Sequence, residues 1–188
     1  MRSSTSLASV VCLLVCLVAG CGVIAQQQPG TLVIRSARLA GAQDAPVLEL
    51  ALDCRLSGPM QDALDHGIPL TLRVGVHSGR WRFAPHAEQS VHRIELRYFP
   101  LSRRYQLRDL DGSADVRSFP TPGYLLAGLN SLRLPLPPAF ASLAPGASLH
   151  VDAGLEPEAL PGALRLPALF EPAWRLSAAE YTWQPAAG

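Results

Sequence analysis

The sequence predicts a mainly β fold, in which antiparallel strands form a two-layer sandwich or one curved sheet and two short helices pack against them. The clearest observation is the stretch 91–112, VHRIELRYFPLSRRYQLRDLDG, where apolar and polar residues alternate on both sides of a break at 100–103. A period of two is typical of strands with one buried and one solvated face, so this stretch predicts a long β-hairpin. Seven or eight segments have the features of strands, and they do not alternate with long helices. A doubly wound parallel sheet is therefore not expected.

The first half of the chain should contain three strands and one helix. Strands are expected at 31–39 and 47–56, close enough in sequence to pair as a hairpin. The motif SGP at 57–59 is typical of a helix start, and the helix should end near Gly67, because glycine readily follows a helix. The next strand is expected at 68–77. The apolar positions of this helix and strand, which should be buried, are Met60, Ala63, Leu64, Leu70, Leu72, Val74 and Val76.

Proline shapes the predictions for the second half. A short strand is expected within 114–119, and an amphipathic helix at 124–132, where leucines recur at helical spacing. The region 134–145 contains prolines at 135, 137, 138 and 145, so it should be an irregular connection. Another strand is expected at 148–155.

The C-terminal part should be largely extended. Residues 156–170 are interrupted by Pro157, Pro161 and Pro167, which predicts extended pieces or turns rather than a helix. The last strand is expected at 173–183.

The N-terminus resembles a secretory signal. An apolar run of about 14 residues, Leu7 to Gly20, follows a short basic and polar start and is shorter than the ~20 residues that a transmembrane helix needs. Cleavage before Cys21 would expose a cysteine for a lipid anchor, whereas cleavage after Ala25 would release a soluble protein. We therefore expect a signal at 1–20, or at 1–25 in the alternative, a tether at 21–30 and a single β-rich domain at 31–184 on the periplasmic side of the cell envelope.

Composition excludes some classes of partner. With 48% apolar and 16% charged residues, the chain should form a globular core. The 16 basic residues are all arginine against 15 acidic residues, and loss of Arg2 with the signal leaves a formal net charge of zero. No nucleic-acid partner is expected. Cys54 follows an alternating strand pattern and should be a buried small hydrophobe.

No catalytic, metal-binding or cofactor-binding site is expected, and the protein is not predicted to be an enzyme. The five histidines lack the spacing of a zinc motif and are interpreted as solvated loop residues: His66, His77, His86, His92 and His150. A calcium loop is incomplete, so its residues are interpreted as a hairpin turn: Asp109, Asp111, Gly112 and Asp115. Asp62 and Asp65 share a helix face and should lie on a wet surface, and no GxSxG motif is present.

A row of arginines is the candidate interaction face. Arg93, Arg97, Arg104 and Arg108 should share the polar side of the predicted hairpin. Guanidinium groups there could meet an acidic partner or lipid phosphates, and the alternative is a solvated face.

Several motifs together resemble the DUF4390 family of bacterial exported proteins. They are Tyr98, Leu101 to Arg103, Tyr105 and Leu107 in the hairpin, Ser118 to Pro120 after it, Gly67 to Leu70, the run 160–169, Trp174 to Ser177, and Tyr181 with Trp183. The resemblance implies no established activity. Members are often encoded beside a sensor histidine kinase, which implies a link to envelope signalling by association.

These observations lead to one main functional hypothesis and one alternative. The main hypothesis is a non-enzymatic exported envelope protein, a lipoprotein anchored at Cys21, that acts as a protein-interaction module. Its partner would be an unidentified protein, such as a membrane sensor kinase. The alternative is a periplasmic carrier or sensor of an apolar ligand, held between the sheet and the helix at 124–132.

Overall fold

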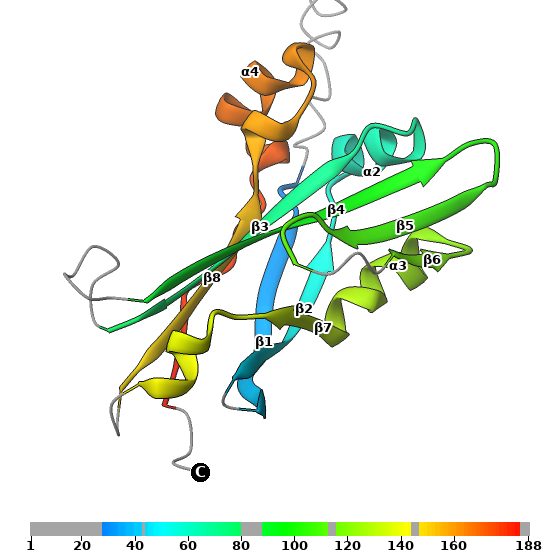
Figure 1. Cartoon of the computed structure of the whole chain (residues 1–188). Helices are drawn as coiled ribbons and strands as arrows, with labels where there is room; N and C mark the ends of the chain where they lie inside the picture. The colour runs from blue at the N-terminus through cyan, green and yellow to red at the C-terminus, as the bar shows by residue number, and fades with distance from the viewer. Residues whose placement is uncertain (1–27, 43, 80–87, 113–115, 144–146, 185–188) are drawn as a thin grey trace, which may run out of the picture.

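The computed structural model describes residues 28–42, 44–79, 88–112, 116–143 and 147–184, which form two antiparallel sheets (Figure 1). The smaller sheet has the order β1-β2-β7, with strands β1 Thr31–Ala42, β2 Ala45–Arg55 and β7 Leu132–Pro135. The larger sheet has the order β6-β5-β4-β3-β8-β9, with strands β3 Leu70–Ser78, β4 Gln89–Phe99, β5 Arg104–Asp109, β6 Val116–Phe119, β8 Leu149–Leu155 and β9 Tyr181–Trp183. The predicted mainly β, antiparallel fold is confirmed.

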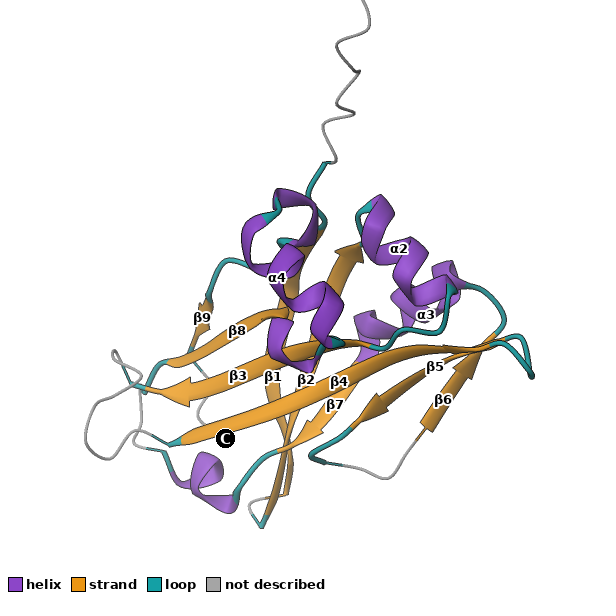
Figure 2. Cartoon of the chain, turned by 90° about the horizontal axis from the view of Figure 1, so that it is seen from above, coloured by secondary structure: helices purple, strands orange, loops and turns teal. Residues whose placement is uncertain are grey.

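Three α-helices lie around the sheets, at the positions that Figure 2 shows in purple. They are α2 Gly58–Asp65, α3 Pro122–Gly128 and α4 Gly162–Phe170, and short 3₁₀ turns include Leu129–Ser131, Pro138–Ser142, Pro157–Ala159 and Pro172–Trp174. The two predicted helices correspond to α2 and α3, whereas α4 was not expected. None of the helices in the described residues has the length and hydropathy needed to cross a bilayer.

One hydrophobic core lies between the two sheets. Alternate residues of β2 and β3 point into it, so Leu48, Leu52, Leu72 and Val74 are completely buried. Phe140, in the 3₁₀ turn after β7, is also buried. Burying apolar surface in this way is the main source of stability, at roughly 25 cal/mol per Å². The period-two patterns in the sequence therefore correspond to real inward faces.

The predicted central hairpin is present as β4 and β5. Tyr98 lies opposite Tyr105, and their ring centroids are 4.6 Å apart, while Leu96 lies opposite Leu107. Arg103 ends the turn with a positive φ of 51°. The arginines and Glu95 lie on the other face, as the alternation predicts, whereas Asp109 lies on the inner face opposite Ile94.

Helix α2 begins and ends where the sequence indicates. The Ser57 side chain accepts a hydrogen bond from the Met60 backbone N–H at 3.4 Å, as expected of an N-cap, and Gly67 has a φ of +81° just after the helix. Met60 and Leu64 are completely buried. The helix thus closes one end of the core.

The prolines of the second half led to one prediction that largely holds and one that was wrong. In its described residues the region 134–145 is an irregular connection, apart from the end of β7 at Pro135 and the 3₁₀ turn Pro138–Ser142. The second prediction treated prolines as breaks and was wrong. Residues 156–170 contain α4 instead of extended pieces. Pro161 directly precedes that helix, where its missing N–H is not needed. Only Pro167 lies inside the helix, and Ala168 next to it packs into the core.

The predicted strand at 173–183 is also shorter than expected. Pro172–Trp174 is a 3₁₀ turn, and only Tyr181–Trp183 forms β9, on the edge of β8. Between them, the N–H of Ala178 donates to the carbonyl of Ala153 at 2.8 Å. The C-terminal segment therefore runs alongside β8 with an interruption, and this interruption sets the position of the Glu180 side chain.

Candidate functional site

Three histidines that were expected in solvated loops are buried on strands, so this prediction was wrong. His77, on β3, and His150, on β8, retain only 4% and 9% of their exposed surface, and His92, on β4, retains 3%. His66 is exposed at the end of α2, as expected, and His86 lies outside the described residues. His77 and His150 occupy polar-face positions that the C-terminal segment with Glu180 and Thr182 covers, whereas His92 lies on the inward face of β4 with Ile94 and Leu96.

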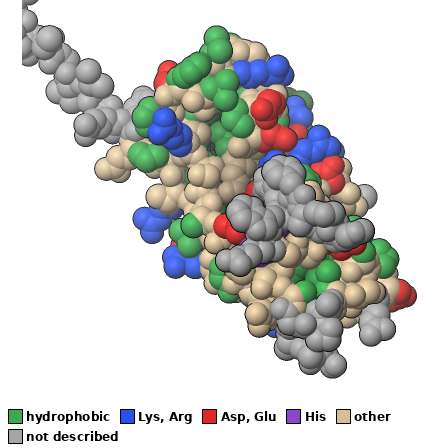
Figure 3. Space-filling model, turned by 90° about the vertical axis from the view of Figure 1, so that its left-hand side faces the viewer, with side chains coloured by type: hydrophobic (Ala, Val, Ile, Leu, Met, Phe, Trp, Pro, Cys, Tyr) green, Lys and Arg blue, Asp and Glu red, His purple; other side chains and the backbone are tan. Residues whose placement is uncertain are grey.

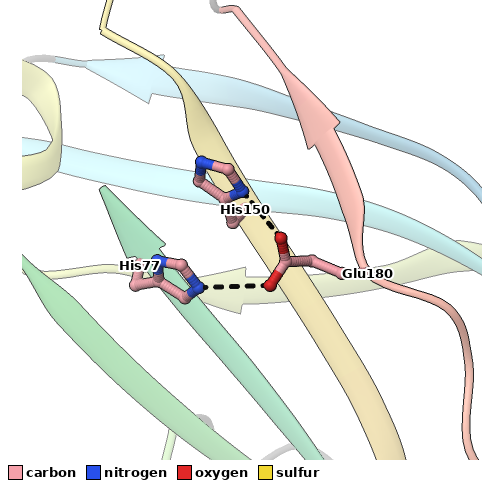
Figure 4. A group of neighbouring side chains, drawn as sticks. All are labelled: His77, His150 and Glu180. Carbon is pink, nitrogen blue, oxygen red and sulfur yellow. Dashed lines mark hydrogen bonds and ion pairs between the residues drawn. The ribbon is translucent and has the colours of Figure 1, made fainter. Parts of the chain in front are cut away.

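Two of these histidines form a cluster with one carboxylate (Figure 4). His77 and His150 lie directly opposite each other on β3 and β8, and their rings stack with centroids 4.8 Å apart and planes within 4°. The Glu180 carboxylate faces both rings: one oxygen is 2.9 Å from His150 Nδ1, and the other is 3.6 Å from His77 Nε2. Thr182 Oγ1 lies 3.0 Å from the same His150 nitrogen. We call His77, His150 and Glu180 the histidine cluster.

A β-bulge between β8 and the C-terminal segment brings Glu180 to this position. Ser177 pairs with Gly154, and Tyr181 pairs with Val151. Four steps along one chain therefore match three along the other, which leaves one extra residue at this edge. Bulges of this kind redirect side chains and are frequent beside functional sites.

In the histidine cluster a carboxylate lies beside two imidazole rings, an arrangement that can hold a proton or a cation between them. The hydrogen bond with His150 is the main cause that lowers the pKa of Glu180 below its ordinary value, so this carboxylate is ionised at neutral pH. An ionised carboxylate only accepts hydrogen bonds, so each ring turns a nitrogen toward it. The other nitrogen of each ring, His77 Nδ1 and His150 Nε2, is buried without a hydrogen-bond partner in the described structure.

The third buried histidine belongs to the core. His92 Nδ1 lies 3.1 Å from the Asp109 carboxylate, and both side chains are almost fully buried. Asp109 also accepts a hydrogen bond from the backbone N–H of Asp111.

The residues predicted to form a hairpin turn have partners within the protein. Asp111 binds Arg93 at 2.7 Å, and the hydrogen bond with Arg93 is the main cause that lowers the pKa of Asp111. Asp115 lies outside the described residues, and Gly112 is next to Asp109.

The predicted arginine face exists, and three of its four members have partners in the protein. All four side chains are exposed on the outer side of β4 and β5. Arg93 binds Asp111, Arg108 lies 3.2 Å from Glu95, and Arg104 donates to Ser118. The guanidinium of Arg97 lies 4.9 Å from the centroid of the Phe99 ring. Two of the four positive charges, those of Arg93 and Arg108, are therefore paired with carboxylates of the protein.

The two aspartates of α2 are exposed, as predicted: Asp62 and Asp65 both lie on the surface. Asp65 accepts a hydrogen bond of 2.7 Å from the Tyr105 hydroxyl, so it fastens the helix to the hairpin. Burial and this bond together raise the pKa of Tyr105 to about 12.

A family profile settles which family the sequence belongs to. The domain of unknown function DUF4390 matches residues 30–184, which is most of the chain. The chain is a member of the DUF4390 family. No curated protein and no solved structure shows significant similarity to it.

The residues that carried the resemblance have structural positions in this DUF4390 protein. Tyr98 and Tyr105 face each other across the hairpin, Gly67 follows α2, and Trp174 is buried near the end of α4. The run 160–169 contains most of α4. The histidine cluster is not among the residues that carried the resemblance.

Cys54 is buried on β2, as predicted, and burial raises its pKa to about 12. The thiolate is the reactive form of cysteine, so we expect Cys54 to resist alkylation in the folded DUF4390 protein and to react quickly in denaturant. Peptide mass spectrometry after iodoacetamide treatment measures this directly. Rapid labelling of Cys54 in the native protein would contradict the burial described here.

Proposed function

We propose that this DUF4390 protein is a non-enzymatic exported envelope protein, lipid-anchored at Cys21, that acts as a protein-interaction module. The partner that we propose is the membrane-proximal periplasmic part of a sensor histidine kinase. The observation that carries the proposal is an exposed apolar surface on α4, at the end of the domain where the described chain begins.

The apolar surface of α4 consists of Leu166, Leu169 and Phe170. Their exposed fractions are 66%, 56% and 73%, and their spacing of three and four residues places them on one side of the helix. The opposite side packs inward through Ala168. A group of large apolar side chains in water is costly, and such groups mark interaction sites in soluble proteins.

This surface lies beside the start of the domain. At Gly30, just before β1, an added side chain would lie 2.9 Å from Leu176, which follows the turn after α4. Figure 3 shows hydrophobic side chains gathered at one end of the molecule, and Figure 1 shows α4 at the end where β1 begins. The start of β1 and α4 therefore share one end of the domain.

The proposed anchor would hold this end close to the membrane. Cys21 and Gln28 are seven positions apart, and seven extended residues span at most about 25 Å. A lipid at Cys21 would therefore keep Gln28, where the described chain begins, within that distance of the bilayer surface, and Figure 1 shows α4 at the same end of the domain. A partner that meets α4 must then present its binding surface near the membrane, which suits the part of a sensor kinase that leaves the bilayer.

The alternative, a carrier of an apolar ligand, finds less support. The space between α3 and the sheets, where that ligand would lie, is filled by Leu125 and Leu129, both completely buried. A pocket beside them, lined by Leu107, Asp109 and neighbouring residues, has a volume of about 210 Å³. Typical ligand pockets measure about 300–1,000 Å³. Two other hollows on the described surface measure about 530 and 780 Å³, but charged side chains that include Arg38 with Glu49 and Arg35 with Asp53 line them, so they do not suit an apolar ligand.

Replacement of Cys21 by serine tests the anchor. We expect the mature wild-type protein to carry a diacylglycerol on Cys21, and Cys21→Ser to leave the membrane fraction. Intact mass spectrometry and membrane fractionation measure the two effects. A mature protein that begins at Gln26 would contradict lipidation, although the interaction through α4 could then still be tested.

Substitution of the α4 surface tests the interaction. We expect the triple variant Leu166→Gln/Leu169→Gln/Phe170→Gln to lose its partner in pull-downs from solubilised membranes and to alter kinase output. Leu101→Gln is the matched control, because Leu101 is fully exposed at the tip of the β4–β5 hairpin. Equal recovery of the partner by both variants would count against the proposed surface.

A further inference from the structure

We propose that the histidine cluster binds a divalent transition-metal ion of the Zn²⁺ class, with His77 Nε2, His150 Nδ1 and the Glu180 carboxylate as its protein ligands. This site goes beyond the proposed interaction through α4, and it lies elsewhere in the fold. The ion would be coordinated by three protein ligands and keep a fourth position for water or a partner group.

The spacing of the ligand atoms fits a small ion. One atom from each residue lies within 4.8 Å of the other two. In a tetrahedral site with bonds of about 2.0–2.1 Å, neighbouring ligand atoms are about 3.3 Å apart. The two imidazole-to-carboxylate distances, 2.9 and 3.6 Å, lie on either side of that value. Small movements of the Glu180 side chain, which is 50% exposed, can equalise them.

The rings must adjust as well. In the described structure they are nearly parallel, so the lone pairs of His77 and His150 lie in parallel planes. Both can reach one ion only when at least one ring turns about its Cβ–Cγ bond. That torsion of histidine is broad, so the turn is accessible.

The ligand set selects the class of ion. Imidazole nitrogens suit Zn²⁺, Cu²⁺, Ni²⁺ and Fe²⁺, whereas Ca²⁺ and Mg²⁺ require oxygen ligands. The strand pairing fixes the two histidines opposite each other, and their hydrogen-bonding partners in the described chain are Glu180 and Thr182. The nearby carboxylate of Asp152 pairs with Arg73 at 3.0 Å and is not counted among the proposed ligands.

Binding would fasten three segments of the domain. His77 lies on β3, His150 on β8, and Glu180 at the bulge before β9. An ion that joins them would hold the short β9 edge against the sheet. Since a ligand at free concentration L that binds only the folded protein stabilises it by RT ln(1 + L/Kd), Zn²⁺ should raise the thermal transition temperature, and the rise should grow with the logarithm of the Zn²⁺ concentration.

The test is titration of Zn²⁺ into the protein purified after expression of the full-length gene. We expect one ion per chain by isothermal titration calorimetry, and Co²⁺ should give the visible bands of a four-coordinate nitrogen and oxygen site. Loss of an outer-shell partner alone costs about 10–100-fold in affinity. The double variant His77→Ala/His150→Ala should therefore lose more than about 100-fold.

Two further variants keep the result interpretable. Glu180→Gln preserves side-chain size at a half-exposed position, so it should fold and still lose more than about tenfold in affinity. His66→Ala removes an exposed histidine on α2 and should bind Zn²⁺ like the wild type. The proposal is overturned if the folded wild type binds no Zn²⁺, if the double variant binds it equally well, or if His66→Ala weakens binding as much as Glu180→Gln.

Discussion

Phe140→Ala should lower the free energy of unfolding by about 3–5 kcal/mol, one of the largest effects of any single substitution in the domain. Phe140 lies in the 3₁₀ turn Pro138–Ser142 with only 1% of its surface exposed, and it is among the largest fully buried side chains. Its removal forfeits the transfer free energy of the ring and leaves a cavity that the surrounding strands can only partly fill. Urea denaturation followed by tryptophan fluorescence measures the change.

Phe170→Ala is the matched control for this substitution. Phe170 is 73% exposed on α4, so the same chemical change should alter stability by no more than about 0.5 kcal/mol. The comparison separates a phenylalanine that fills the core from one that is available to a partner. Equal losses of stability in the two variants would show that α4 packs against another part of the chain, which contradicts the exposed surface described here.

Asp109→Ala should be the most damaging substitution among the acidic residues, with a loss of at least about 2 and up to about 5 kcal/mol. Asp109 is almost fully buried and accepts hydrogen bonds from the His92 ring at 3.1 Å and from the Asp111 backbone at 3.0 Å. Truncation removes this partner from the almost fully buried His92 ring and also removes the acceptor of the Asp111 backbone N–H. Thermal and denaturant unfolding at pH 7 measure the loss.

The control is Asp53→Ala on β2. Asp53 pairs with Arg35, but both side chains are well exposed, at 40% and 62%. Exposed ion pairs contribute about 0–1 kcal/mol, so this variant should unfold close to the wild type. If Asp109→Ala were tolerated as well as Asp53→Ala, the buried pair between His92 and Asp109 would not contribute as described.

Local patterns predicted much of the first half of the fold. Alternation over 91–112 is enough to define the β4–β5 hairpin, because the turn at 100–103 is short and the two strands are neighbours in sequence. Ser57 and Gly67 similarly bound α2, since capping depends on residues at each end. Such features need only information that lies within a few residues.

Predictions failed where tertiary packing outweighs a local signal. Proline lowers helix propensity wherever it occurs in a helix interior, yet α4 forms around Pro167 because the helix packs against the core through Ala168 and Leu164. The interruption before β9 depends on how the C-terminal segment pairs with β8. Neither the helix nor the interruption can be predicted from the residues of its own segment alone.

The histidine cluster illustrates the same difficulty at a site. His77 and His150 occupy polar-face positions of strands that were correctly predicted, which was the available signal that they are not loop residues. Their meeting depends on pairing between β3 and β8, which are separated by four other strands in the sequence. Glu180 lies beside them because of the β-bulge before β9, and no sequence motif predicts that bulge.

The most direct test of the central claim, that this protein acts through the exposed surface of α4, is photo-crosslinking in living cells. A photoreactive amino acid placed at Leu169 should capture one discrete membrane protein, whereas the same residue at Leu101 should capture none. An adduct with lipid only, no adduct at Leu169, or the same protein captured from both positions would contradict the account.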